Sequence, residues 1–274
     1  NNAGFVVMEE GLAAYVGNWL VMLPLILAAF VGAIGFPVIV DLRRRWRHPK
    51  SLSLHSKITL TTYIALAVAT GLIIAALEWN NPYTFGDLNF SEKALNTIVG
   101  AINTRSLGIS AIDVSQMTGA SWLVQDISMF IGGGSGSHAG GIKVTTFTIL
   151  VLAAWAEARG RRDVEAFRRR LPQNTIRQAV AVLLVAGVLV LSVSAILLGI
   201  TPFTLDRILF EVISAFGTVG LSTGITSALP PAAKLLLALV MGVGRVGPMT
   251  FAAGLALRER RSFIRMPEER PIVG

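Results

Sequence analysis

The sequence has no cysteine and few charged side chains. Without cysteine, a disulfide framework and a thiolate metal site are both excluded. Only 15% of the 274 residues are charged, 53% are hydrophobic, and the mean hydropathy is +0.64. Soluble domains carry roughly a quarter of their residues as charged ones, so this composition indicates a membrane protein. The three histidines lack metal-ligand spacing, and there is neither a nucleophile elbow nor an HExxH motif, which argues against a membrane enzyme.

Long apolar stretches predict an all-α polytopic membrane protein, because each is about long enough to cross a bilayer. The expected spans cover residues 19–40, 58–77, 121–156, 175–200 and 231–257. The third is interrupted by glycines at 132–141 and the last at 242–248. Two further helices, 91–102 and 204–215, are too short to cross, and Ser91 is the expected cap of the first.

The basic residues are concentrated in three segments. Eighteen of the 24 Lys and Arg lie within residues 43–57, 159–177 and 258–270. A simple alternation of spans puts all three segments on one side, which the positive-inside rule identifies as cytoplasmic. The net charge of +8 could suggest nucleic acid as a partner, but a nucleic-acid surface would not partition with the spans in this way. We therefore expect membrane lipid as a partner and no nucleic acid.

Each short helix leads into a tight polar loop that closes on a glycine and precedes a long apolar segment. These loops are residues 103–110 and 217–222, and residues 1–5 resemble the end of a third unit. Aligning Gly4, Gly108 and Gly220 gives a repeat of roughly a hundred residues, suited to a repeated membrane module. Such a layout is typical of an ion filter, in which backbone carbonyls replace an ion's water. The alternative is an ordinary glycine turn in an extracellular loop.

The glycine run in the third span indicates non-helical backbone at membrane depth, which survives only when buried in protein or facing a water-filled cavity. A loose dinucleotide fingerprint in this run is rejected, because membrane-length helices flank it. Lys143 and Arg245 are cations within spans, and such residues usually face a cavity or a partner. Asp126 is a possible counter-ion for either one. The alternative for the cations is snorkelling, or bonding to carbonyls at a helix end.

These motifs, in this order, resemble those of the Trk/Ktr/HKT potassium-uptake family, and most closely the KtrB/TrkH-type pore subunits of bacteria. The resemblance implies four repeats of outer helix, pore helix, filter loop and inner helix around a pseudo-fourfold pore. On this view residues 1–50 hold the filter and inner helix of repeat two, 51–170 hold repeat three, and 171–274 hold repeat four. The chain is then expected to be N-terminally truncated, with the first filter absent and no complete pore of its own.

The resemblance also implies roles for individual residues. The selectivity filter maps onto Asn1, Asn2, Ala3, Gly4, Arg105, Ser106, Leu107, Gly108, Gly217, Thr218, Val219 and Gly220. The gate maps onto Gly133, Gly134, Ser135, Gly136, Ser137, Gly140, Gly141, Lys143 and Arg245. Thr104 and Glu211 are expected to support the filter, with Glu211 accepting backbone N–H bonds. The Arg105 side chain is expected to be a structural donor behind the filter, since a cation repels cations. Arg245 is expected to act as an electrostatic barrier or an anchor of the gating loop.

The implied function is a potassium-translocating pore subunit, with K⁺ held only at the filter and no cofactor bound by this chain. Resemblance further implies a homodimer in the bacterial cell (inner) membrane, with a cytosolic RCK-type regulatory subunit (KtrA/TrkA-like) that binds the nucleotide. Three alternatives stay open: a Na⁺-coupled K⁺ symporter, a Na⁺-permeable pore of the same family, and a non-conducting truncated subunit.

Overall fold

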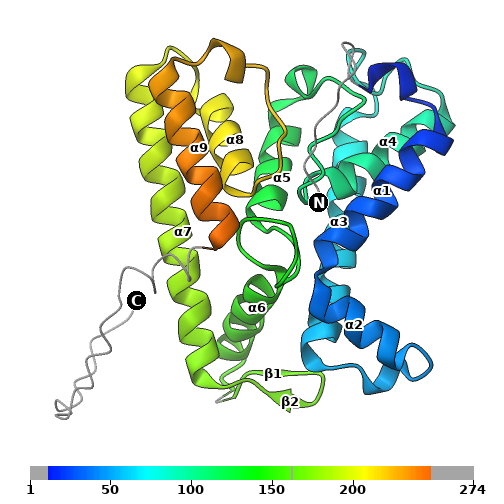
Figure 1. The fold of residues 1–274 in the computed structure, drawn as a ribbon, viewed down its shortest axis with the longest axis vertical. Helices are drawn as coiled ribbons and strands as arrows, with labels where there is room; N and C mark the ends of the chain where they lie inside the picture. Colours follow the sequence, from blue (N-terminus) through cyan, green and yellow to red (C-terminus); the bar gives the residue numbers. More distant parts are fainter. Residues whose placement is uncertain (1–11, 162, 248–274) are drawn as a thin grey trace.

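The computed structural model describes residues 12–161 and 163–247. Within them, helices make up most of the structure (Figure 1). The helices are α1 (Trp19–Ile34), α2 (Phe36–Arg45), α3 (Leu54–Glu78), α4 (Phe90–Asn103), α5 (Gly119–Phe130), α6 (Val144–Ala158), α7 (Gln173–Ile200), α8 (Leu205–Phe216) and α9 (Pro231–Val246). Short 3₁₀ turns lie at Ala13–Tyr15, Pro49–Ser51, Val114–Gln116 and Thr226–Ala228.

The helices gather around two hydrophobic clusters that lie side by side. One cluster joins α7, α8 and α9 with part of α5, and the other joins α1, α3 and α4. Figure 1 shows the first group on the left and the second on the right, with α5 between them. Because α5 packs against both α3 and α8, it connects the two halves of the molecule. The halves meet where the polar loops that follow α4 and α8 lie.

The two short predicted helices are present as α4 and α8, 14 and 12 residues long. The cap of α4 differs from the expected one. Asn89, not Ser91, accepts from the backbone N–H of Glu92, and the Glu92 carboxylate accepts from the Asn89 N–H, which forms a capping box. Ser91 instead accepts a hydrogen bond from the Trp19 indole at 3.1 Å.

Within the described residues, α3 and α7 are long and apolar enough to cross a membrane. The expected span at 19–40 is sharply bent: α1 and α2 are apolar enough to cross together, either as a broken span or as a re-entrant loop. Its chain breaks at Gly35, where φ is 100°, and α1 and α2 meet at 97°. A side chain at Gly35 would press on the Ser135 carbonyl, with only 2.6 Å between that oxygen and the added Cβ. The bend therefore makes room for the glycine-rich segment between α5 and α6.

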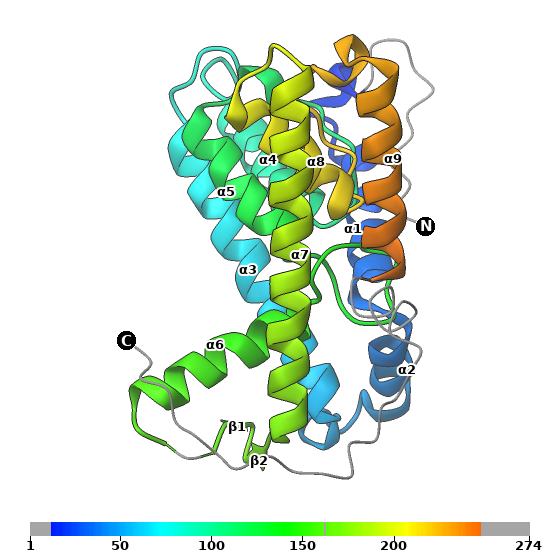
Figure 2. The same cartoon turned by 90° about the vertical axis from the view of Figure 1, so that its left-hand side faces the viewer.

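The predicted break in the third span is confirmed, because α5 ends at Phe130 and α6 begins at Val144. Figure 2 shows α6 leaving at a steep angle to the upright α7. Helix α9 runs unbroken through Gly242 and ends at Gly247, where φ is 93°. An interruption beginning at Gly242 was therefore wrong, and the rest of that predicted span lies outside the described residues.

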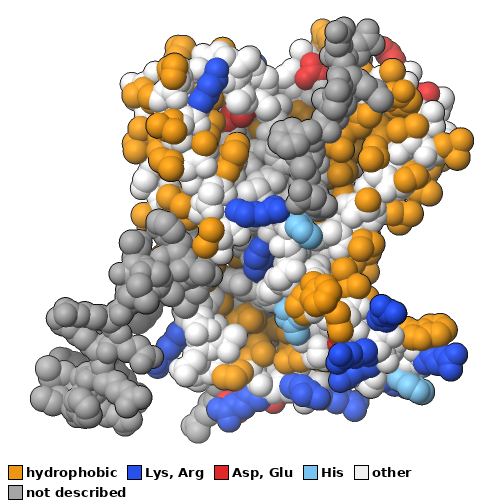
Figure 3. Space-filling view, viewed as in Figure 1, with side chains coloured by type: hydrophobic (Ala, Val, Ile, Leu, Met, Phe, Trp, Pro, Cys, Tyr) orange, Lys and Arg blue, Asp and Glu red, His pale blue; other side chains and the backbone are white. Residues whose placement is uncertain are grey.

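The second basic segment is not only a loop. It contains a small antiparallel hairpin of β1 (Glu165–Ala166) and β2 (Arg169–Arg170), turned by Phe167 and Arg168 at positive φ. The fold remains mostly helical, as predicted, and this hairpin of two-residue strands is a local feature of the basic loop. Lys and Arg gather around α2 and this hairpin at one end of the molecule (Figure 3). Helices α4 and α8 lie in the opposite half (Figure 1). The third basic segment, 258–270, lies outside the described residues.

Candidate ion pathway: two loops and a glycine segment

The first loop (residues 104–110) and the second loop (residues 217–223) have the same backbone course. Ser106 and Gly108 have φ of 68° and 69°, and Thr218 and Gly220 have φ of 49° and 94°. In each loop, a left-handed non-glycine residue is followed two positions later by a left-handed glycine. Because such angles are uncommon outside glycine, the shared pattern supports the predicted alignment of Gly108 with Gly220.

The two loops touch one another. The Ser106 hydroxyl donates to the Gly217 carbonyl at 2.9 Å. An added Cβ on Gly220 would lie 3.3 Å from the Gly108 Cα. Both glycines have the positive φ that was expected to disfavour a side chain, and at Gly220 the close approach of Gly108 disfavours one further. The expected third loop, Asn1, Asn2, Ala3 and Gly4, lies outside the described residues.

The first loop is supported from α4 and α5. Asn103, at the end of α4, accepts from the Ile109 N–H at 3.0 Å. Thr104 is buried and its hydroxyl lies 2.9 Å from that of Ser128 on α5. Thr104 thus contacts the neighbouring helix, in agreement with a supporting position.

Arg105 extends its side chain away from the first loop into the protein. The guanidinium is fully buried and donates to the carbonyls of Ile131 at 2.9 Å and Gly132 at 3.3 Å. A third bond reaches the Ser128 hydroxyl at 3.3 Å, and the group lies over the Tyr63 ring. These contacts match the expected structural donor, so only the backbone of Arg105 is available to face an ion.

Glu211 on α8 supports the second loop. Its carboxylate accepts from the Thr223 N–H at 2.9 Å, the Ser222 hydroxyl at 2.5 Å and the Thr226 hydroxyl at 2.6 Å. The predicted bracing by backbone N–H donors is confirmed for one donor, and hydroxyls supply the others. Ser214, one turn further along α8, donates to the Leu221 carbonyl at 2.6 Å.

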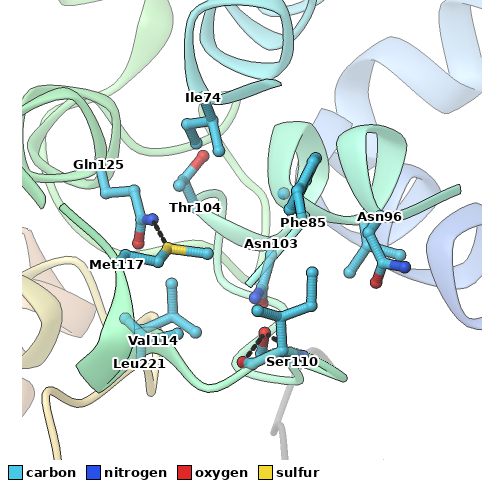
Figure 4. A pocket seen from close by; sticks show the side chains of 13 residues that line it. Ile74, Phe85, Asn96, Asn103, Thr104, Ser110, Val114, Met117, Gln125 and Leu221 are labelled. Carbon is cyan, nitrogen blue, oxygen red and sulfur yellow. Dashed lines mark hydrogen bonds between the residues drawn. The ribbon is translucent and has the colours of Figure 1, made fainter. Parts of the chain in front are cut away.

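A small cavity of about 20 Å³ lies behind the first loop, which is room for one water molecule. Figure 4 shows Asn103, Thr104, Gln125 and Ser110 among the side chains around it. The Gln125 carbonyl oxygen is buried and lacks a protein partner. The first loop therefore lies partly against a small, mostly apolar cavity, whereas the second loop is bonded directly to the Glu211 carboxylate.

The glycine segment (residues 131–143) leaves and re-enters the helices through a narrow neck. The Gly132 N–H donates to the Ile142 carbonyl at 2.8 Å, and the Ile142 N–H donates to Phe130 at 3.1 Å. Its far part bonds to the end of α1, where Gly134 donates to Ala33 at 2.8 Å. Side chains at Gly133 and Gly134 would collide with carbonyls of α1. Glycine is thus required for this close backbone approach.

The two predicted cations, Lys143 at the end of the segment and Arg245 on α9, both bind carbonyls of the segment. Arg245 on α9 donates to the His138 carbonyl, and the Lys143 ammonium donates to the Ala139 carbonyl. Ser135 pairs with the Thr145 hydroxyl at 3.0 Å, while Ser137 accepts from the Ala139 N–H. Asp126 as their counter-ion was wrong. Among the described residues, the ion pairs are Arg45–Asp41 and Arg170–Asp163.

The segment also touches the second loop. The Gly140 N–H donates to the Thr218 hydroxyl at 3.0 Å, and an added Cβ on Gly140 would lie 2.9 Å from the Gly217 carbonyl. Gly141 has φ of 73° and Gly136 has φ of 72°. The structure therefore brings the predicted gate residues against the predicted filter residues Gly217 and Thr218.

Two supporting residues were missed by sequence reasoning. Asn103 was assigned only to the polar loop, although its place at a helix end before a glycine loop suits a side-chain acceptor. Glu78 is fully buried at the end of α3. Its carboxylate accepts from the Thr118 N–H at 2.9 Å and from the side chains of Asn81 and Thr84, each at 2.7 Å. The sequence signal for Glu78 is a single carboxylate at the end of an apolar span, which needs nearby hydrogen-bond donors if it is buried.

Comparison with known proteins agrees with this arrangement. Residues 1–260 match the family model TrkH, described as a cation transport protein. The chain is 34% identical over its full length to the Ktr system potassium uptake protein B of Vibrio alginolyticus, covering 60% of that protein. It is 36% identical to the Bacillus subtilis protein of the same name, covering 61% of it. The chain thus spans about three fifths of the length of these relatives.

Two further matches are informative. The chain is 34% identical over its full length to the potassium/sodium uptake protein NtpJ of Enterococcus hirae, covering 61% of that protein. The crystal structure of the potassium transporter TrkH from Vibrio parahaemolyticus superposes with a TM-score of 0.76 at 15% identity, over 94% of this chain and 56% of that one. That match concerns the fold alone. By its family match over nearly the whole sequence, the chain belongs to the TrkH family of cation transport proteins.

Proposed function

We propose that this chain forms part of the pore of a potassium-uptake protein, and that its two glycine loops are K⁺ selectivity filters. The observation that carries the proposal is the shared left-handed pattern of Ser106–Gly108 and Thr218–Gly220 in adjoining loops. Left-handed backbone turns carbonyls out of their usual direction, and carbonyl oxygens are what replaces the water of a K⁺ ion. The names of the potassium-uptake relatives support the same ion.

The glycine segment (residues 131–143) is proposed as the gate. It lies against the second loop through Gly140 and against α9 through Arg245. Glycine backbone can change its course at low cost, because glycine populates both signs of φ. Arg245 would hold the segment closed by its bond to His138, and its charge would oppose a passing cation.

The larger assembly follows from the same reasoning. We propose a pseudo-fourfold pore in which residues 1–50, 51–170 and 171–274 belong to three successive units, completed in the whole protein. We propose that the basic end, with α2 and the hairpin, lies on the cytoplasmic side of a bacterial inner membrane. A homodimer and a cytosolic RCK-type subunit that carries the nucleotide are proposed as partners, with the basic surface as the docking region.

A second candidate is a pore or symporter that also moves Na⁺. One relative is named a potassium/sodium uptake protein, which is the observation that favours it. Uptake of K⁺ by cells expressing the full-length protein, measured with and without Na⁺, separates the two. K⁺ uptake that needs no Na⁺ supports the first candidate, and strict dependence on Na⁺ supports symport.

The filter assignment is tested by Gly220→Ser in the full-length protein. Gly220 has φ of 94°, a conformation that costs a non-glycine residue on the order of 1–3 kcal/mol. Since about 1.4 kcal/mol corresponds to a tenfold change, partial relaxation of the loop should lower the K⁺/Na⁺ uptake ratio roughly tenfold. The ratio is measured from isotope or flame-photometric uptake at matched expression.

The matched control is Gly187→Ser on α7, where an added Cβ meets nothing within 4 Å. Gly71 would be an unsuitable control, because a Cβ there would lie 2.9 Å from the Ala101 Cβ on α4. An unchanged ratio in Gly220→Ser, at parent expression, would remove Gly220 from the filter and with it the main support for a K⁺ pore.

A further inference from the structure

We propose that the two filters and the gate are joined in a closed ring of hydrogen bonds, so that the ion held by the filter controls the exposure of the gate. This inference rests on the proposed function of both regions. Arg105 and Thr218 are the positioning residues of the ring, because each belongs to a filter loop and bonds to one end of the glycine segment. Neither needs to contact the ion through its side chain.

The first link is the buried Arg105. Its guanidinium donates hydrogen bonds to the carbonyls of Ile131 and Gly132, where the glycine segment begins. Among the described residues it forms no ion pair, so carbonyl dipoles, the Ser128 hydroxyl and the Tyr63 ring are what stabilise its charge. Moving the two carbonyls away would leave a buried cation short of acceptors, which is costly. Arg105 therefore holds the start of the glycine segment to the first loop.

The second link is Thr218, at the other end of the segment. Its hydroxyl accepts from the Gly140 N–H at 3.0 Å, and there is no space for a side chain on Gly140. Thr218 keeps a left-handed φ of 49° although it is not glycine. The second loop holds Thr218 in this conformation. A shift of the second loop would therefore move the acceptor of the Gly140 N–H.

Two further bonds close the ring. The Ser106 hydroxyl, next to Arg105, donates to the carbonyl of Gly217, next to Thr218. The neck of the segment joins its two ends through the Gly132 to Ile142 bond at 2.8 Å. Together with the backbone between neighbouring residues, these hydrogen bonds form a continuous path from the first loop to the second loop and back through the glycine segment.

A consequence follows for the tip of the segment, residues 133–139, which lies outside the ring and is held by α1 and Arg245. An ion that fits the filters keeps Ser106 and Gly217 in place, so the neck stays closed and the tip stays packed. A smaller ion draws the loops inward and strains the ring. By linkage, the ion that stabilises the closed ring must also protect the tip.

The test uses the full-length protein with Ser137→Cys, since the 274 residues contain no cysteine and any outside them can be replaced. The rate of modification by a small thiol reagent is measured in K⁺ and in Na⁺ at equal ionic strength. We expect the rate to be roughly fivefold or more lower in K⁺, the lower bound of typical coupling between sites. Equal rates in the two ions, in protein that transports K⁺ selectively, would overturn the ring but not the proposed function.

Thr218→Val and Arg105→Lys then break the ring at its two ends. Valine keeps the shape of threonine without its hydroxyl, and lysine keeps the charge without the planar fork that binds two carbonyls. Both variants should lose the ion effect, while the control Thr145→Val, which removes the Ser135 bond outside the ring, should retain it. If either variant fails to insert, Ser106→Ala cuts the link between the filters. An ion effect that survives these changes would contradict the inference, and a parent without K⁺ preference would overturn both proposals.

Discussion

The first and second loops have the same backbone pattern but different supports. Asn103 holds the first loop with a neutral amide, and a cavity with room for one water lies behind it. Glu211 holds the second loop with a carboxylate that accepts three strong bonds. The buried charge beside the first loop is instead the cation of Arg105, directed at the glycine segment.

The two loops have left-handed backbone at matching positions, whereas the groups that hold them are an amide in the first and a carboxylate in the second. Carbonyl direction depends on the backbone angles, so two sets of side chains can hold a similar backbone course. In the described part of the chain, Arg105 also connects the first loop to the start of the glycine segment.

The largest expected effect concerns how α8, the helix before the second loop, packs against α9. The end of α8 rests on Gly244 of α9, where any Cβ would collide with the Phe216 carbonyl. Gly244→Ala should therefore destabilise the full-length protein by about 3 kcal/mol, at the upper end of overpacking effects. The measurement is the midpoint of thermal unfolding in detergent.

The control lies two residues away on the same helix. An added Cβ on Gly242 meets nothing within 4 Å, so Gly242→Ala should be neutral or slightly stabilising because alanine favours helix. Equal melting of the two variants would show that close packing of α9 on α8 does not support the second loop.

A smaller effect compares the two braces directly. Glu211→Ala leaves the buried Thr223 N–H and two hydroxyls without their acceptor, and should cost about 2 to 3 kcal/mol. Asn103→Ala removes one neutral acceptor from Ile109 and should cost about 1 kcal/mol. Unfolding midpoints and K⁺ uptake of both variants are measured together. A larger loss for Asn103→Ala would reverse the proposed difference between the loops.

The smallest effect concerns the junction between α2 and α3, beyond the apolar spans. Asp41 accepts from the Ser56 hydroxyl at 2.6 Å and the Ser53 N–H at 2.9 Å. The Ser56 bond is the main cause that lowers the pKa of Asp41 from 3.8 to about 2. Because the folded pKa is depressed, its stabilisation is present above pH 4 and is lost as the pH falls through about 2.

Asp41→Asn should therefore lower stability by the same small amount from pH 8 to pH 5, and the difference from the parent should shrink below pH 4 and vanish only below pH 2. The control is Asp163→Asn, just before the β1–β2 hairpin, where the carboxylate pairs with Arg170 at 2.8 Å. A difference between parent and Asp41→Asn that changes between pH 8 and pH 5 would show that another group titrates at this junction.

Much of the helical order follows from the sequence, because apolar length and basic segments are local properties. The short helices, the glycine break before α6 and the need for glycine at Gly108 and Gly220 were all predicted. Glycine and proline in the first span favour a kink, but its size, 97° at Gly35, could not be predicted, since it accompanies a contact with Ser135 a hundred residues away in the chain. The β1–β2 hairpin was missed because its turn uses Phe167 and Arg168 rather than glycine.

The site was predictable to a lesser degree. Glu211 could be identified as a brace because a carboxylate in a short buried helix needs nearby donors. The destinations of the Arg105 guanidinium and the Thr218 hydroxyl depend on how the glycine segment packs against the two loops, which no local pattern encodes. Asp126 illustrates the same limit: a carboxylate within a span suggested a partner for the two cations, but Lys143 and Arg245 bind carbonyls instead.

We propose that the two loops jointly hold a dehydrated cation. A crystal structure of the full-length protein grown in Rb⁺ or Tl⁺ tests this, because the anomalous scattering of these ions distinguishes them from water. We expect an anomalous peak beside the main-chain carbonyls of residues 106–108 and 218–220, reduced in Gly220→Ser. Protein that transports K⁺ but shows no peak at these carbonyls would contradict it.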